Sequence, residues 1–177
     1  RGTAVLGAHG NTSGPQRIDP GGSTGEGSWN ELVGPGKAVD TNRFFAICPN
    51  MLGSSYGSTN GASIDPNTSE PYGPRFPDIT VSDIVGTQRL LIDQLGITKL
   101  FAIVGPSYGG FQAFQWAVNY PDMMKGIAPI VTSPLVPRER PEGNVDSLLG
   151  TLSKDPSCNR GQPSRPGRGR GPRPQHP

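Results

Sequence analysis

The chain has 177 residues, a formal net charge of +2 and a hydrophobic content of 32%. This length is enough for one domain with a packed core, but 26 glycines and 20 prolines leave much of the chain to loops. No apolar run approaches the roughly 18 residues that cross a membrane, and the N-terminus has no signal-peptide pattern. We therefore expect a cytoplasmic protein without a membrane partner. The two cysteines, Cys48 and Cys158, have no metal-ligand spacing, so we expect reduced thiols and no metal site.

The first third of the chain contains two expected strands. Residues 3–8 form a short apolar run that ends at His9, and residues 44–48 form a second run that ends at Pro49. Residues 50–80 then show no sustained period, and loops of this length within a domain are usually functional or disordered. The acidic residues of this stretch have no ligand spacing and are expected to cap turns; they are Asp65, Glu70 and Asp78.

The middle of the chain alternates helices with strands. A helix is expected from an N-cap at Ser82 to about Leu95, with Gly96 as its stop. Its apolar face contains Ile84, Val85, Leu91, Ile92 and Leu95. A strand at residues 100–104, a helix ending before Tyr120 and a strand at 126–131 follow. This alternation predicts an α/β fold with a doubly wound, mainly parallel sheet and flanking helices.

The pattern Gly-x-Ser-x-Gly occurs three times, at residues 21–25, 53–57 and 105–109. In a chain so rich in glycine, about one chance match is unsurprising, so the flanking sequence has to decide. The first match has no apolar run before it, and the second is followed by residues that open a helix poorly. Only Ser107 lies between an apolar strand and an apolar helix, which is the setting of the nucleophile elbow of an α/β-hydrolase.

The residues around Ser107 fit a sharp turn between strand and helix. Gly105 and Gly109 lack a Cβ where strand and helix approach most closely, and Ser107 would hold a strained backbone that exposes its hydroxyl. The N–H of Tyr108 would begin the helix, where a developing oxyanion meets a donor and the positive end of the helix dipole. The alternative is a buried strand and helix with Ser107 as an ordinary N-cap.

The sequence changes character after about residue 134. Residues 135–155 show no sustained period, and residues 156–177 are dominated by Pro, Gly, Arg, Gln and Ser, so we expect disorder there. Five arginines gather in this tail, while the rest of the chain is mildly acidic. Arginines spaced by glycine are typical of RNA-binding tails, but aromatic residues are missing between them. We expect a solvated terminus and no nucleic-acid partner.

Several segments resemble homoserine O-acetyltransferases. Residues 32–45 read LVGPGKAVDTNRFF, residues 50–59 read NMLGSSYGST, and residues 71–80 and the turn at Ser107 follow in the same order. The resemblance covers roughly residues 3–134 and implies the N-terminal half of an α/β-hydrolase-fold acyltransferase. It predicts a partial core at 1–134, a divergent segment at 135–155, a disordered tail at 156–177 and an incomplete sheet.

The resemblance implies a two-step acetyl transfer in methionine biosynthesis. Ser107 takes the acetyl group from acetyl-CoA, and the acyl-enzyme passes it to the hydroxyl of homoserine. The N–H groups of Tyr108 and Asn11 form the oxyanion hole, while His9 is a hydrogen-bonded loop residue and not the general base. Acetyl-CoA is then a co-substrate with no assigned binding residues, no cofactor is bound, the partners are small-molecule substrates, and a homodimer is allowed.

Two departures from the family pattern leave alternatives open. Family members commonly have Met after the nucleophile, and Tyr108 leaves room for an esterase or another acyl acceptor. The fold places the triad in the order Ser, Asp, His, but only His176 follows Ser107, with Asp146 and Asp155 as the aspartates between beyond Asp122. Because no strand precedes His176, we expect the base and its carboxylate to be missing. A catalytically dead, truncated fragment is therefore the second alternative.

Overall fold

The computed structural model describes residues 3–25, 27–134, 150–151 and 154. The chain divides into two compact units, which are described separately: residues 1–60 with 77–136, and residues 61–76 with 137–177. Apart from 150–151 and 154, the expected segments 135–155 and 156–177 lie outside the described residues.

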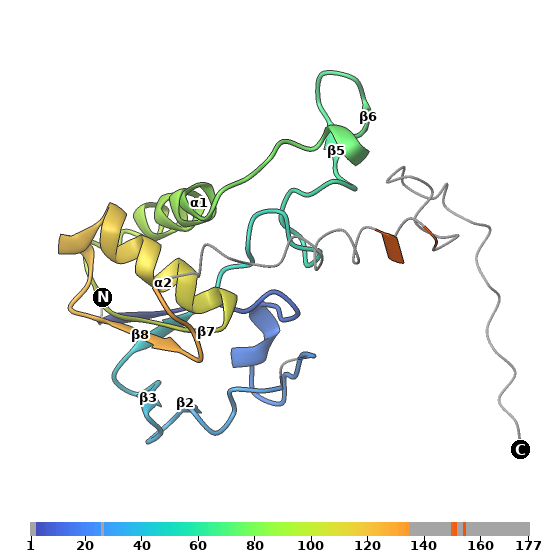
Figure 1. Cartoon of the computed structure of the whole chain (residues 1–177). Helices are drawn as coiled ribbons and strands as arrows, with labels where there is room; N and C mark the ends of the chain where they lie inside the picture. The colour runs from blue at the N-terminus through green and yellow to red at the C-terminus, as the bar shows by residue number, and fades with distance from the viewer. Residues whose placement is uncertain (1–2, 26, 135–149, 152–153, 155–177) are drawn as a thin grey trace, which may run out of the picture. The chain divides into compact units, whose positions relative to one another are not determined.

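A parallel sheet forms the centre of the first unit. Among the described residues it has four strands in the order β4-β1-β7-β8 (Figure 1). Their bounds are Ala4–Gly7 for β1, Phe45–Ile47 for β4, Leu100–Pro106 for β7 and Ile127–Ile130 for β8. Each neighbouring pair runs parallel. The prediction of a parallel α/β sheet is therefore confirmed, and β1 and β7 are its central described strands.

The described α-helices, α1 (Val81–Gln94) and α2 (Tyr108–Asn119), pack on one face of this sheet (Figure 1). Leu6 and Ile103 from the sheet join Ile92 of α1 and Trp116 of α2 in a fully buried cluster. Burying an aliphatic side chain of this size contributes about 1.5–3 kcal/mol. The cluster thus holds both helices against β1 and β7.

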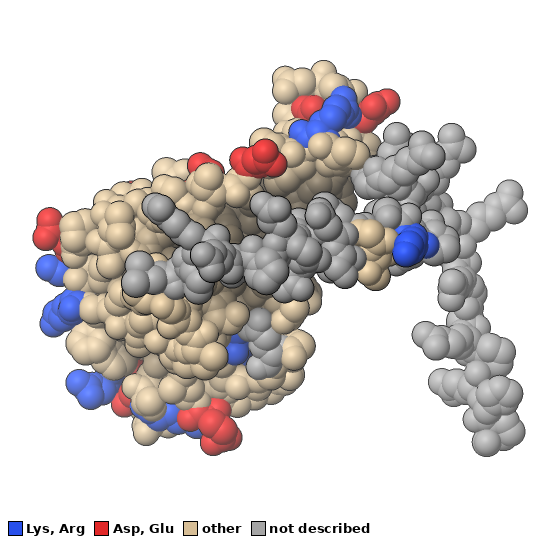
Figure 2. Space-filling model, in the orientation of Figure 1, with Lys and Arg blue, Asp and Glu red and all other residues tan. Residues whose placement is uncertain are grey.

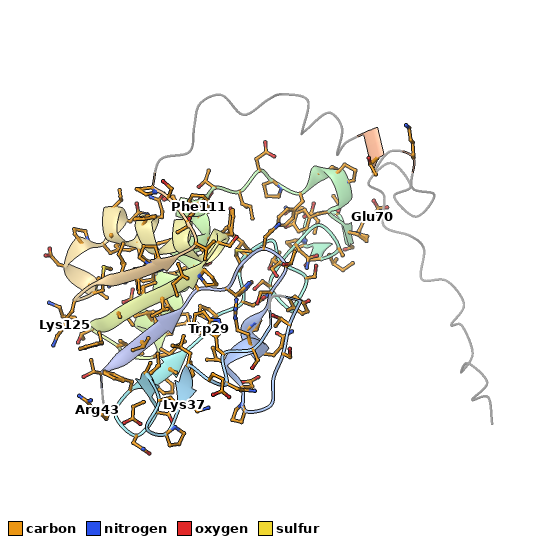
Figure 3. All side chains as sticks on the ribbon, turned by 60° about the horizontal axis from the view of Figure 1, so that its bottom comes forward. Trp29, Lys37, Arg43, Glu70, Phe111 and Lys125 are labelled. Carbon is orange, nitrogen blue, oxygen red and sulfur yellow. The ribbon has the colours of Figure 1, made fainter. Side chains whose placement is uncertain are left out.

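A loop region covers the opposite face. Val5 and Val104 pack there against Trp29 and Val39, and Trp29 lies beside the sheet (Figure 3). The region contains short elements only: η1 (Pro15–Ile18), β2 (Val33–Gly34) and β3 (Val39–Asp40). A doubly wound sheet has helices on both faces, whereas the described residues place them on one. The glycine- and serine-rich connection after β1 does not sustain a helix, because such residues disfavour it.

Helix α1 begins earlier than the sequence predicted. Thr80, not Ser82, is the N-cap: its hydroxyl accepts a hydrogen bond from Asp83 N at 3.2 Å, and Thr80 N donates to Asp83 Oδ2 at 2.7 Å. This capping box needs an acidic or amide side chain three residues after the cap, which Ser82 lacks. Gly96 follows the helix with φ +68°, as predicted for its stop. No described helix is long and apolar enough to cross a membrane.

Helix α2 ends at Asn119, as expected, and is followed by η3 (Pro121–Met123).

In the second unit, β5 (Ile64–Asp65) pairs antiparallel with β6 (Glu70–Pro71), before η2 (Gly73–Arg75). Asp65 Oδ1 accepts a hydrogen bond from Asn67 N at 2.9 Å, so this residue caps a turn as predicted. Glu70 instead lies 3.7 Å from Arg75 in an exposed ion pair. Such pairs contribute about 0–1 kcal/mol.

Candidate active site

Ser107 lies at the sharp turn that joins β7 to α2. Its backbone has φ 51° and ψ −119°, a conformation that residues with a side chain rarely adopt. Such a conformation costs about 1–3 kcal/mol and persists only where the surrounding structure enforces it. Within the described part of the chain its hydroxyl makes no capping hydrogen bond, and the residue is exposed. The ordinary N-cap alternative therefore does not describe Ser107.

Glycines enforce this turn by allowing backbones to touch. A Cβ on Gly105 would overlap the backbone of Gly109, and a Cβ on Gly109 would overlap the carbonyl of Ala8 at the end of β1. A Cβ on Gly110 would overlap the methyl group of Thr132. The first turn of α2 is thus pressed against the ends of both central strands. Gly105 and Gly109, which the sequence assigned to close approach, are therefore positions at which the structure requires glycine.

The other two Gly-x-Ser-x-Gly matches have no such setting. Ser23 and Ser55 lie in irregular segments with no helix after them. Gly21 and Gly57 in these matches have φ of +76° and +109°, as turn glycines often do. The flanking sequence therefore selected the match that lies between a strand and a helix.

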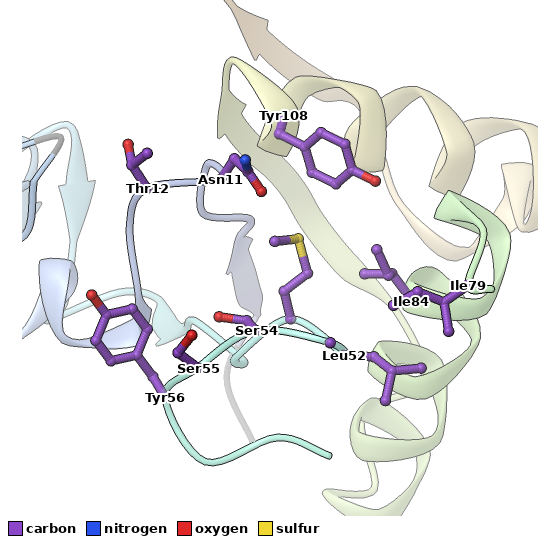
Figure 4. Close-up of a pocket in the computed structure, with 11 residues that line it drawn as sticks. Asn11, Thr12, Leu52, Ser54, Ser55, Tyr56, Ile79, Ile84 and Tyr108 are labelled. Atoms are coloured by element: carbon purple, nitrogen blue, oxygen red, sulfur yellow. The ribbon is translucent and has the colours of Figure 1, made fainter. Parts of the chain in front are cut away.

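Asn11 and Tyr108 lie at one pocket of about 500 Å³ (Figure 4). Asn11 follows β1, whose pairing with β7 is extended by a 2.8 Å hydrogen bond from Ala8 N to Val104 O. Among the described residues the backbone N–H of Asn11 donates no hydrogen bond. Tyr108 is the first residue of α2, and the first N–H groups of a helix have no intrahelical acceptor. The structure therefore brings the two expected oxyanion donors to the same pocket.

The rest of the pocket has two different sides. Figure 4 shows hydroxyl-bearing side chains on one side, from Thr12, Ser54, Ser55 and Tyr56. The other side is apolar and is formed by Leu52, Ile79 and Ile84. A pocket of this size suits a small molecule with a polar and an apolar part. In the view of Figure 2, the basic and acidic side chains of the first unit lie mainly along the outline of that unit.

His9 is buried two residues before Asn11, and its ring has two hydrogen-bond partners. Nε2 accepts a bond from Met51 N at 3.0 Å, so the proton belongs on Nδ1, which donates to Gly10 O at 2.8 Å. Both ring nitrogens are therefore engaged with the backbone. This geometry matches the expected loop histidine and gives it no role as a base.

A series of buried, hydrogen-bonded side chains was not predicted from the sequence. Trp116 Nε1 donates to Gln88 Oε1 at 2.8 Å, and Gln88 Nε2 donates to Gln112 Oε1 at 2.7 Å. Gln112 Nε2 donates in turn to His9 O at 3.0 Å and lies 3.2 Å from Met51 Sδ. Both glutamines stand at apolar positions of their helices, and this is the signal that could have revealed them.

The described part of the chain has few other groups that could act as a nucleophile or hold a metal ion. Burial raises the pKa of the Cys48 thiol to about 12, so this cysteine is a poor nucleophile. No group of three His, Cys, Asp or Glu side chains among the described residues is placed to hold a metal ion. Asp122 lies in η3 beyond α2, and Asp146, Asp155 and His176 lie outside the described residues.

A parallel sheet whose central strand ends at a strained, exposed serine, directly before a helix, defines a nucleophile-elbow protein. A family model described as the alpha/beta hydrolase fold matches residues 10–157, and the chain belongs to this family. The resemblance to homoserine O-acetyltransferases is confirmed as well. The homoserine O-acetyltransferase of Deferribacter desulfuricans is 53% identical over 107 residues, which cover 60% of this chain and 28% of that protein.

Solved structures show the same likeness in three dimensions. The homoserine O-acetyltransferase of Bacillus anthracis superposes with a TM-score of 0.77 at 31% identity, covering 90% of this chain and 45% of that one. An acetylester hydrolase of Corynebacterium glutamicum gives a TM-score of 0.73 at 29% identity, covering 93% and 43%. The chain thus spans less than half the length of these proteins. It is similar to a transferase and to a hydrolase.

Proposed function

We propose that the chain carries the nucleophile of a serine acyltransferase, which moves an acetyl group from acetyl-CoA to the hydroxyl of homoserine or a similar acceptor. The observation that carries this proposal is the strained, exposed turn at Ser107, directly before Tyr108, which lines a pocket together with Asn11. The homoserine O-acetyltransferases among its relatives supply the donor and acceptor. The reaction would belong to methionine biosynthesis in the cytoplasm.

The proposed chemistry has two halves. In the first, Ser107 Oγ bonds to the thioester carbon, the C–S bond breaks and the CoA thiol leaves with the serine proton. In the second, the acceptor hydroxyl attacks the serine ester and restores Ser107. Each half passes through an oxyanion, and the Tyr108 and Asn11 amides are the donors that would stabilise it. Removing one such donor typically costs about 10²–10³ in rate.

The serine proton needs an acceptor in the first half. The chain contains two histidines, and His9, the one among the described residues, uses both ring nitrogens on the backbone. Residual catalysis without a triad is about 10³–10⁴ over water, which comes from the oxyanion hole and binding. An activated ester with a good leaving group therefore gives the most sensitive assay of this chain.

Acetyl ester hydrolysis is the second candidate function. It is favoured by the likeness to the acetylester hydrolase and by the hydroxyl-rich side of the pocket, which gives water a polar path to the site. The two functions share the acyl-enzyme and differ only in what removes the acetyl group. Adding homoserine to the assay separates them: a transferase forms O-acetylhomoserine, whereas a hydrolase releases acetate at an unchanged rate.

The test is a stopped assay of the chain with 4-nitrophenyl acetate. We expect a burst of about one nitrophenolate per chain, which Ser107→Ala abolishes. Ser23→Ala is the matched control, because it removes the serine of another Gly-x-Ser-x-Gly match and should leave the burst intact. A flat trace from the unaltered chain would contradict the proposal and support the catalytically dead fragment.

A further inference from the structure

The series of buried hydrogen bonds from Trp116 to His9 has a fixed donor-to-acceptor direction. An indole N–H can only donate, so Gln88 must present its oxygen to Trp116 and its NH₂ group to Gln112. Gln112 then presents its oxygen to Gln88 and its NH₂ group to the His9 carbonyl. No amide in the series can be turned over without placing two donors or two acceptors face to face. The orientation of Gln112 is therefore determined by its neighbours.

This series of hydrogen bonds ends at His9, two residues before Asn11, and at Met51, which lines the pocket. Gln112 contacts the His9 carbonyl and the Met51 sulfur, and Met51 N donates to the His9 ring. These contacts join residues that are 42 and 103 positions apart in the sequence. The residue that follows Gly10 is Asn11, which lines the pocket. Gln112 thus holds the peptide chain two residues before the expected oxyanion donor.

We propose that Gln112 is a positioning residue, whose side-chain amide fixes the turn at residues 9–11 and so sets the Asn11 N–H for an oxyanion on the substrate. The proposal rests on the proposed function for the role of that N–H. It does not depend on which acceptor takes the acetyl group. Gln112 itself touches no reacting atom, because its contacts are the His9 carbonyl, the Met51 sulfur and Gln88.

Energetics argue for a role beyond packing. Gln112 and Gln88 are 0% and 2% exposed, and burying an amide costs free energy unless it is fully hydrogen-bonded. Apolar side chains of similar volume at these positions would pack against the sheet without that requirement. What the glutamines supply instead is direction: a bond of defined geometry to one carbonyl, which an apolar side chain does not make.

The structural arm of the test is amide hydrogen exchange in Gln112→Met, which keeps the side-chain length but does not donate. Met51 N and Ala8 N report on the turn, and Ile103 N, which donates to Gly126 O, reports on the sheet. We expect protection of Met51 and Ala8 to fall by about tenfold or more relative to Ile103. Gln115→Met is the matched control, because Gln115 donates to Asn119 on the same helix.

The chemical arm is the rate at which an alkyl 4-nitrophenyl phosphonate modifies Ser107. The P–O bond to Ser107 forms, the bond to nitrophenolate breaks, and the serine proton is released to the buffer. We expect the limiting rate constant to fall about 10- to 100-fold in Gln112→Met. The phosphonate concentration that gives half of this limiting rate should be unchanged. Gln112→Glu, which places an acceptor against the His9 carbonyl, should fall at least as far.

The outcomes separate this proposal from the function on which it rests. Selective loss of protection at Met51 and Ala8, together with the slower limiting rate, supports the positioning role. Equal loss at Ile103, or unchanged protection at Met51 and Ala8, overturns it, even if Gln112→Met reacts slowly. If Ser107 of the unaltered chain is not modified, the proposed function fails, and the exchange data alone decide whether Gln112 holds the turn.

Discussion

Two turns meet at the candidate active site, and they are held in different ways. The turn at Ser107 is fixed by backbone contact, because Gly105 and Gly109 leave no room for a side chain. The turn at Asn11 is held by hydrogen bonds from distant segments: the Met51 backbone N–H donates to the His9 ring, and the Gln112 side chain donates to the His9 carbonyl. The glycines that permit the Ser107 turn lie within five residues of one another, so they form a pattern that can be recognised in the sequence. The residues that hold the Asn11 turn are far apart in the sequence and form no such pattern.

This difference assigns the two turns different sensitivities. A single methyl group should damage the Ser107 turn, since a backbone atom has nowhere to move. The Asn11 turn should instead fail by degrees as its hydrogen bonds are removed one at a time. The substitutions below test that contrast, from the largest expected effect to the smallest.

Gly109→Ala should be the most destabilising. The new Cβ would overlap the Ala8 carbonyl and lie 3.2 Å from the His9 carbonyl, so relief requires β1 and α2 to separate. We expect a loss of about 3 kcal/mol or more in the free energy of unfolding, measured by urea titration. Gly86→Ala is the control: its Cβ meets nothing within 4 Å, and a helical alanine should stabilise by about 0.5–1 kcal/mol. Equal stability of the two variants would refute the steric account.

His9→Leu should weaken the Asn11 turn by a smaller amount. It removes the acceptor for the buried Met51 N–H, and an unsatisfied buried donor costs about 1–3 kcal/mol. Urea unfolding measures the loss, which should be partly restored in His9→Gln, because the glutamine oxygen can accept from the same amide. A leucine variant as stable as the unaltered chain would show that the ring's hydrogen bonds do not hold this turn.

Thr80→Val tests a site outside both turns, at the start of α1. Loss of the capping hydroxyl should cost about 1 kcal/mol of unfolding free energy and leave the modification of Ser107 unchanged. Ser82→Ala is the comparison, since the sequence favoured Ser82 as the cap. In the structure its hydroxyl accepts an exposed hydrogen bond from Asn119 Nδ2 at 2.9 Å and caps no helix end. A larger loss from Ser82→Ala would restore the sequence-based assignment.

The same cap should give the smallest effect, a dependence on pH. Hydrogen bonds from the Thr80 hydroxyl and the Thr80 amide hold the pKa of the Asp83 carboxyl below its usual value of 3.8. A depressed pKa stabilises the folded chain above the unfolded value, and this contribution is lost as pH falls through the folded one. Asp83→Asn should therefore differ from the unaltered chain near neutral pH and converge with it below about pH 4. A difference independent of pH would contradict the capping box.

The features that could be predicted from the sequence are those set by residues close to one another along the chain. The strands of the sheet, the stop at Gly96 and the choice of Ser107 among three motif matches all follow from short runs and their flanking residues. The N-cap of α1 was misplaced by two residues, since Thr80 and Ser82 are both good caps and only the partner Asp83 distinguishes them. The start of α2 at Tyr108 agrees with the sequence, because the turn at Ser107 fixes where the strand ends and the helix begins.

What the sequence did not predict depends on distant contacts. Gln88 and Gln112 appear as polar residues on apolar helix faces, but their partners lie on other elements. The loop cover over the second face of the sheet, with Trp29 at its centre, also has no local pattern. The placement of Asn11 came from the family resemblance, and its pocket became visible only in the fold.

The central claim is that one strained turn makes one serine chemically distinct. The most direct measurement is to treat the chain with 4-nitrophenyl acetate, quench it in acid and map the acetyl group by peptide mass spectrometry. The account predicts acetylation of Ser107, with Ser23 and Ser55 unmodified although both lie in the same motif. Acetyl groups spread over all three serines, or absent from Ser107, would contradict it.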